Sequence, residues 1–179
     1  MPTPIVAGNL ISAVTYGGFT TGTTAAPVDP TDSLLSSPAD ILQAYIVDVL
    51  GLLSDPADND DWPCYVGFLP EDYPSRNLVN AVAVLDTNGV KDAKTMLGSM
   101  IVKHGIQIAI RSSTYQAGWV KAETIAIALD AIAGGEVTND VDTYEIQNAS
   151  RTGPVLALGV DEKRASRFVI NLRLTVKKQ

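Results

Sequence analysis

Cysteine, histidine and positive charge are scarce in this chain of 179 residues, and each shortage excludes a class of function. The sequence has one cysteine, Cys64, and one histidine, His104, so it can form no internal disulfide and no zinc site built from Cys and His ligands. Lys and Arg number 13 against 20 Asp and Glu, which gives a formal net charge of −7. Because acidic chains repel phosphate, we do not expect this protein to wrap nucleic acid or to dock on anionic lipid.

Long apolar runs and targeting signals are also missing. No apolar run approaches the ~18 residues that are needed to span a bilayer. The N-terminus lacks the basic region of a secretory signal. We therefore expect a soluble, unsecreted protein with no membrane partner.

Catalytic and cofactor motifs are absent as well. Nucleophilic catalysis by a Ser-His-Asp or Cys-His pair would need His104, whose position beside Gly105 predicts a turn residue instead. No strand precedes a GxGxxG pattern, and no glycine-rich loop is followed by a lysine. The acidic run at 55–61 has oxygen ligands but lacks the glycine and the terminal glutamate of a calcium loop. We expect no enzyme, cofactor or metal site, although a cation-dependent enzyme or ligand-binding module using this run stays open.

What the sequence does have is enough apolar material for a core and a strong asymmetry of charge. Hydrophobic residues make up 46% of the chain, which predicts one compact domain with an appendage. Residues 1–75 contain ten acids and no Lys or Arg, whereas residues 151–179 contain seven basic residues and two acids. Opposite poles on one chain favour head-to-tail self-association, with two solvated faces that never meet as the alternative.

The chain divides into an N-terminal arm and one folded domain. Residues 1–36 are almost uncharged and rich in Thr, Gly, Ala, Ser and Pro, so we expect a flexible arm or one that becomes ordered on a neighbouring subunit. Residues 37–179 form the domain. Ser37 followed by Pro38 predicts the start of a helix that ends near Asp55, and a second helix is expected over 116–133.

Several strands accompany these helices. Strands are expected at 62–70, at 78–85 before a turn at 86–89, and within 96–111. Further strands are expected near 141–149, at 155–160 and at 167–177, where apolar residues alternate with Arg167, Asn171, Arg173 and Lys177. Together these elements predict an α+β fold with two layers, in which two main helices pack on one face of a mixed sheet.

Three segments carry a resemblance to a known family: YPSRNLVNAVAVLDTNG, GIQIAIRSSTYQAGWVKAETIAIALDAI and GPVLALGVDEKRASRFVINLRLTV. In their order and spacing, these segments resemble the tail-terminator and minor capsid proteins of long-tailed bacteriophages. The resemblance covers about residues 37–179, and the arm before it is longer than the family leads us to expect.

The resemblance implies a structural virion protein that sits in the neck or tail and assembles in the host cytoplasm. Such a protein forms a homo-oligomeric ring, usually a hexamer, that caps the tail tube and stops its polymerisation. Its partners would be the tube protein and the head–tail connector or stopper, with the tape measure protein as a further candidate, while DNA passes through the lumen without specific binding. The alternative within the same class is another neck component, such as a connector stopper.

Eight polar or charged residues are candidate contacts in such a ring. They come from the strand that ends at Arg111, from the last strand and from the acidic run: Arg111, Arg167, Asn171, Arg173, Lys177, Asp58, Asp60 and Asp61.

Overall fold

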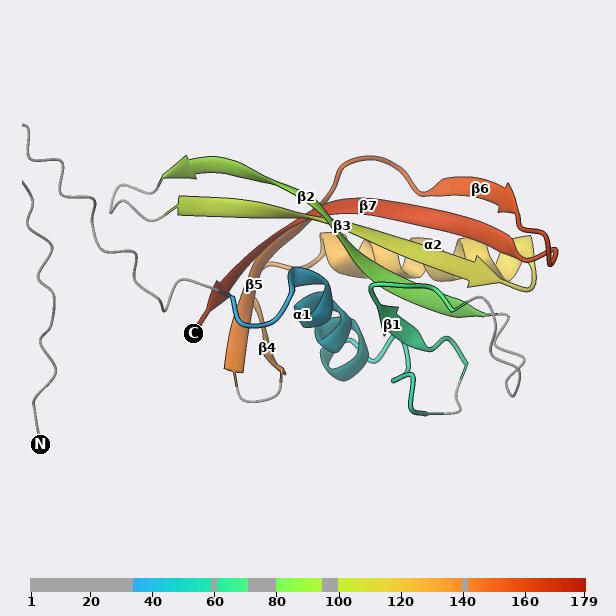
Figure 1. Cartoon of the computed structure of the whole chain (residues 1–179), viewed down its shortest axis with the longest axis horizontal. Coiled ribbons are helices and arrows are strands. Elements are labelled where there is room, and N and C mark those ends of the chain that lie inside the picture. Colours follow the sequence, from blue (N-terminus) through green and yellow to red (C-terminus); the bar gives the residue numbers. More distant parts are fainter. Residues whose placement is uncertain (1–33, 59–60, 71–79, 95–99, 140–141) are drawn as a thin grey trace, which may run out of the picture.

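A curled mixed sheet carries both helical segments on one of its faces (Figure 1). The computed structural model describes residues 34–58, 61–70, 80–94, 100–139 and 142–179. The described elements are α1 (Pro38–Ala44), η2 (Tyr45–Val49), β1 (Cys64–Val66), β2 (Ala81–Lys94), β3 (Met100–Ser112), α2 (Tyr115–Asp130), β4 (Gly135–Asn139), β5 (Asp142–Arg151), β6 (Leu156–Val160) and β7 (Ser166–Lys178). The expected α+β fold is confirmed.

The strands follow the order β1-β2-β3-β7-β5-β4, and β6 also pairs with β7. The β1–β2 pair is parallel, whereas the other pairs are antiparallel. One edge of β7 is shared, because β6 pairs with residues 166–169 and β5 pairs with residues 172–178. The long final strand therefore joins both halves of the sheet.

The first helix begins where the sequence predicts. The Ser37 hydroxyl accepts a hydrogen bond from the Asp40 N–H at 3.1 Å, and Pro38 occupies the first turn, where no N–H is needed. A second acceptor lies outside the helix, since the Asp86 carboxylate on β2 accepts a hydrogen bond from the Ala39 N–H at 3.0 Å. These contacts satisfy N–H groups of the first turn and fix α1 against the sheet.

The predicted end of this helix near Asp55 is wrong. The turn widens into the π-helical η2, and regular structure stops at Val49. Gly51 then adopts a φ of +58°, a left-handed conformation that glycine reaches without steric cost. The chain reverses there, so residues 52–58 form a loop instead of a further turn of helix.

The predicted turn at 86–89 is also wrong. β2 continues through these residues with a bulge between Thr87 and Val90, and it pairs with β3 as far as Lys94. His104 lies inside β3, opposite Leu174, and is not a turn residue. Gly105 allows this close pairing, because a Cβ there would collide with the Asn88 carbonyl oxygen. The cross-strand partner therefore overrides the local turn signal.

The core lies between the sheet and the helices. Alternate residues of β3 and β7 face α1 and α2 and are almost fully buried. The strand residues on this face include Val82, Val84, Ile106, Ile108, Ile110, Phe168, Ile170, Leu172 and Leu174. The helices contribute Ile41, Leu42, Ile46, Ala122, Ile125, Ala126 and Leu129. Burial of this set on two layers supplies the main driving force for folding.

The second helix starts one residue early and ends three residues before its expected limit. Thr114 caps it by accepting a hydrogen bond from the Ala117 N–H at 3.3 Å. After Asp130 the chain turns through residues 131–134 into β4, a strand that the sequence patterns do not predict.

The opposite face of the sheet carries a much smaller apolar cluster. Tyr65, Ala81 and Ala83 are buried there, with Leu69 and Leu85 packed against them. Residues 67–70 lead from β1 toward this face, and Phe68 contacts the Tyr65 ring at a centroid distance of 6.0 Å. Most of the expected arm lies outside the described residues, but Ser36 is anchored by a hydrogen bond from its N–H to the Tyr144 hydroxyl at 3.2 Å.

Candidate assembly surface

The polar residues of β7 line the face of the sheet that points away from the helices. Leu172 and Leu174 are buried on the helix side, so Asn171 and Arg173 project to the other side. Asn171 lies opposite Gln107 of β3 and accepts a hydrogen bond from its side-chain amide at 3.1 Å. This outer face contains five of the eight residues that the sequence proposes as contacts.

Arg111 belongs to this face but is buried, with 7% of its surface exposed. Its guanidinium donates a hydrogen bond to the Pro70 carbonyl oxygen at 2.7 Å. The contact joins β3 to the segment that follows β1, across 41 positions of sequence. Arg111 therefore holds the fold together, and its guanidinium is covered rather than presented to a partner.

Arg167 lies beside Arg111 in the β3–β7 register and is committed to a local ion pair. Its Nε lies 3.2 Å from Asp161 Oδ2 at the start of the β6–β7 hairpin. Asp161 Oδ1 also accepts hydrogen bonds from the N–H groups of Lys163 and Ala165, at 3.0 and 2.9 Å. Burial raises the pKa of Asp161, but the bonds from Ala165, Arg167 and Lys163 outweigh it and leave the pKa below its ordinary value.

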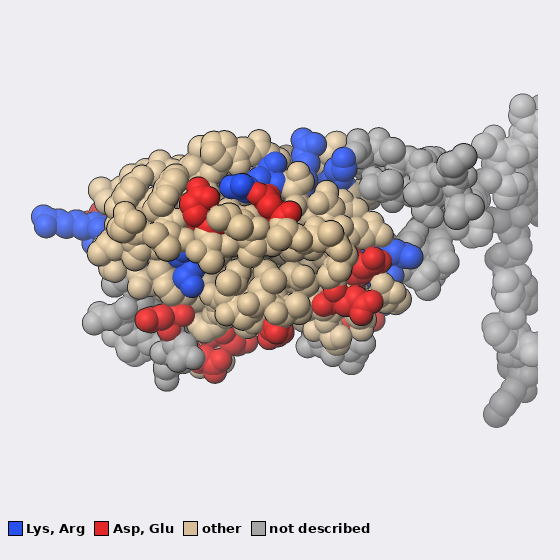
Figure 2. Space-filling model, turned by 180° about the vertical axis from the view of Figure 1, so that it is seen from behind, with Lys and Arg blue, Asp and Glu red and all other residues tan. Residues whose placement is uncertain are grey.

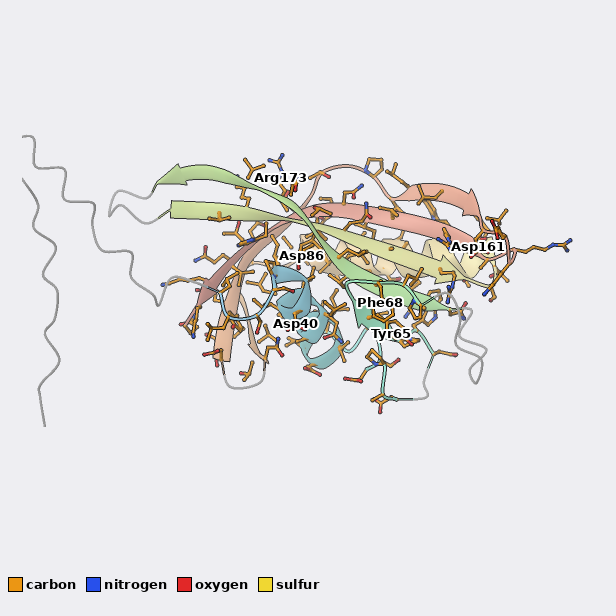
Figure 3. All side chains as sticks on the ribbon, in the orientation of Figure 1. Asp40, Tyr65, Phe68, Asp86, Asp161 and Arg173 are labelled. Atoms are coloured by element: carbon orange, nitrogen blue, oxygen red, sulfur yellow. The ribbon has the colours of Figure 1, made fainter. Side chains whose placement is uncertain are left out.

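Arg173 and Lys177 are the exposed cations of β7. Arg173 lies on the side of the sheet away from the helices (Figure 3), opposite Gly105 of β3 on one side and Ser150 of β5 on the other. Lys177 lies opposite Glu145 of β5. These two side chains are the members of the predicted basic set that the fold leaves most available to a partner.

The acidic candidates lie in the loop that joins η2 to β1. Asp58 and Asp61 are exposed, whereas Asp60 lies outside the described residues. Asp55 Oδ1 accepts a hydrogen bond from the Ala57 N–H at 2.7 Å, which closes a tight turn. Among the residues that the structure describes, no group of three or more His, Cys, Asp or Glu side chains comes together as a metal site.

Lys121 of α2 fixes this loop from the inside. Its Nζ donates a hydrogen bond to the Leu52 carbonyl oxygen at 3.0 Å and lies 5.3 Å from the centre of the Trp62 ring. Burial lowers the pKa of Lys121, and the nearby Asp61 opposes that shift. The loop is therefore tied to the helix layer. This contact places the exposed carboxylates of Asp58 and Asp61 at the β1 edge of the molecule.

The basic and acidic candidates do not meet within one chain. Arg173 and Lys177 lie on the fourth strand in the sheet order and on its outer face, whereas Asp58 and Asp61 lie beyond the edge strand β1. The surface view agrees: Lys and Arg gather mostly along one long border and one end, and Asp and Glu mostly along the opposite border (Figure 2). The charge asymmetry of the sequence is thus a separation in space.

One edge of the sheet is an exposed apolar strand. The sequence patterns predict this strand, at 155–160, but they do not predict that it is exposed. Leu156, Leu158 and Val160 of β6 are 45%, 62% and 69% exposed. β6 pairs with β7 on one side, and no other described strand pairs with it. The uncharged run GPVLALGV is the signal for this strand, but such a run is equally typical of a buried strand.

No protein-family model matches this chain, and no curated protein is similar to it. In the described part of the chain, no helix combines the length and the apolar character that crossing a bilayer requires.

The single cysteine and the single histidine of the chain lie on β1 and β3. Cys64 is fully buried, and burial raises its pKa to about 12, so it remains a protonated thiol at neutral pH. His104 lies on β3, where burial lowers its pKa against the opposing effect of Asp86. The described surface also carries two charged borders and one apolar edge.

Proposed function

We propose that this protein is a structural subunit of a long-tailed bacteriophage virion that forms a ring, caps the tail tube and ends its polymerisation. The observation that carries the proposal is the separation of a basic border, Arg173 and Lys177 of β7, from an acidic border, Asp58 and Asp61 of the loop before β1. A surface with unlike, distant patches joins head to tail, and a head-to-tail contact closes into a ring when the rotation per subunit fits.

The residues in each border support this reading. Arg173 and Lys177 are exposed, and neither is needed by the core. Asp58 and Asp61 are equally exposed on a loop that Lys121 holds in place. The backbone of the acidic loop is therefore already held in the single chain, which reduces the ordering that its contact would need.

The sequence resemblance supplies the partners of this proposal. A ring of this family would contact the tail tube on one side and the head–tail connector on the other. The net charge of −7 suits a lumen through which DNA passes without binding, because carboxylates repel phosphates.

Reversing charge on the basic border tests the proposal. The double variant Arg173→Glu with Lys177→Gln should fold normally, because exposed substitutions change stability by less than about 0.5 kcal/mol and a neutral side chain at 177 adds no repulsion with Glu145 opposite it. It should fail to assemble when its oligomeric state is measured by light scattering. Gln116→Glu is the control, since Gln116 is exposed on α2, away from this border.

A charge swap identifies the partner patch. Adding copies that carry Asp58→Lys should restore assembly of the β7 double variant, because a complementary pair is rebuilt with opposite signs, while Asp61 is kept since it lies near Lys121 of the same chain. Assembly of the β7 variant at the same concentration as the parent chain would contradict the proposed contact.

A further inference from the structure

β6 has the properties of a strand edge that is covered in an assembly. All five of its residues are exposed, and its free edge lacks the Lys, Glu or Pro residues that block unwanted pairing in other proteins. The bulge between Ala157 and Gly159 is the one such device present, and it leaves Leu158 62% exposed. An uncovered edge of this kind would promote uncontrolled association, so a defined occupant is required.

The occupant has to be a short, uncharged segment that can form a strand. Residues 9–14, NLISAV, fit this requirement: they carry no charge, and they include the β-branched Ile11 together with Val14. They belong to the longest stretch without Pro or Gly, residues 9–16, in the part of the chain that precedes the described fold. Pro and Gly both weaken strands, so this stretch is the best strand former in the arm.

The position of the arm favours a second copy as its source. The described chain starts at Leu34, and Ser36 is anchored to Tyr144 of β5 near the end of the molecule where the C-terminus lies. β6 lies at the opposite end (Figure 1). A head-to-tail pair that brings the C-terminal end of β7 in one copy to the end of the next copy where β6 lies would let the arm enter there without running the length of its own domain.

The reach of the chain is sufficient. From Val14 to Leu34 there are 20 residues, which span up to about 66–72 Å when extended. A contact across one subunit boundary needs only part of this length.

We propose that residues 9–14 of one copy add as a strand to the free edge of β6 in the neighbouring copy. Main-chain hydrogen bonds would satisfy the edge, and the arm's apolar side chains would cover Leu156, Leu158 and Val160. The inference rests on the self-association in the proposed function, and it assigns that association a second, apolar contact that salt does not screen.

Cross-linking between copies tests the pairing directly. Copies with Ser12→Cys are mixed with copies that carry a cysteine at 156, 158 or 160, and disulfides are allowed to form in the full-length proteins. The native Cys64 is buried and protonated, so it contributes little background. Ile127→Cys on α2 is the matched control, because Ile127 is 63% exposed and Leu158 is 62% exposed.

A disulfide between copies at one or more β6 positions, but not at 127, is the expected result. Equal cross-linking at 127, or none at any β6 position, would overturn the inference. A disulfide that forms within single chains of the double variant Ser12→Cys/Leu158→Cys at high dilution would overturn the assignment to a second copy.

Two further pairs of variants separate a loss of the proposed strand contact from a loss of folding. Ser12→Pro removes an N–H from the proposed strand without touching the described domain, and we expect assembly to weaken by about tenfold or more, which corresponds to about 1.4 kcal/mol. Thr24→Pro, outside residues 9–14, should have no such effect. Leu158→Lys should weaken assembly and Ile127→Lys should not.

The outcomes separate the inference from the proposed function. A ring that forms without cross-links to β6, and that tolerates Ser12→Pro, refutes the strand exchange and leaves the ring proposal intact. A chain that stays monomeric at every concentration refutes both.

Discussion

Asp161 closes the β6–β7 hairpin with hydrogen bonds from Lys163, Ala165 and Arg167, and its pKa lies below the ordinary value as a result. A carboxylate with a lowered folded-state pKa adds stability that is present above its unfolded-state pKa of about 3.9 and is lost as pH falls through its folded value. Asp161→Asn should lower the free energy of unfolding by about 1–2 kcal/mol at pH 7. Urea denaturation should show that this difference in the free energy of unfolding between parent and variant becomes small near pH 2. An equal difference at pH 2 and pH 7 would contradict a stabilising role for the Asp161 carboxylate.

His104 predicts a pH dependence in a different range. Burial lowers its folded-state pKa below 6.5, so the unfolded chain binds more protons near pH 6. Stability should therefore fall as pH decreases from about 7.5 through 6.5, until the folded histidine also titrates. Denaturation midpoints of the parent chain should show this decline in stability. In the His104→Gln variant, the midpoint should change less with pH over the same range. A variant with the parent's full slope would place the proton uptake elsewhere.

At the scale of elements, β7 is the strand on which both halves of the sheet depend. Leu172 is 2% exposed on its inner side, between β3 and β5. Leu172→Ala should lower the free energy of unfolding by about 2–5 kcal/mol, because burial is lost and a cavity is left. Arg173→Ala, one residue away on the outer face, is the matched control and should stay within about 0.5 kcal/mol. Similar thermal melts for the two variants would contradict this division of β7.

Local sequence patterns predict these elements correctly only where no contact with a distant part of the chain overrides them. The alternation over 167–177 and the cap at Ser37 are confirmed as β7 and the start of α1. The turn signal at 86–89 fails because β3 pairs across it, and the helix stops at Val49 because Gly51 turns the chain. Both wrong predictions have the same cause. The strand pairing with β3 and the backbone angle of Gly51 are not contained in the local secondary-structure propensities of these residues.

The candidate surface follows the same rule. Alternation places Arg173 and Lys177 on the outer face, and both are exposed. Arg111 shares their face, yet Pro70, which lies 41 positions away, covers its guanidinium. Arg167 is an equally poor choice for a charge reversal, because Glu there would face Asp161. Non-local contacts of this kind cannot be read from strand periodicity.

At the scale of the whole molecule, the two charged borders make self-association dependent on salt. Screening shortens the Debye length from about 10 Å at 0.1 M to about 3 Å at 1 M salt, so contacts between exposed charges weaken. Light scattering should show assemblies that loosen over this range. Arg173→Gln with Lys177→Gln, which removes these two charges without reversing them, should weaken assembly and remove most of the dependence. An oligomer that dissociates on dilution but ignores salt would exclude the charged borders from the interface.

Negative-stain electron microscopy of the purified full-length chain would show whether it forms a ring. At low salt, and at concentrations where light scattering reports association, we expect closed rings of a single symmetry, built from head-to-tail contacts. Monomers at all concentrations, or a two-fold dimer that joins identical surfaces, would contradict the proposed ring.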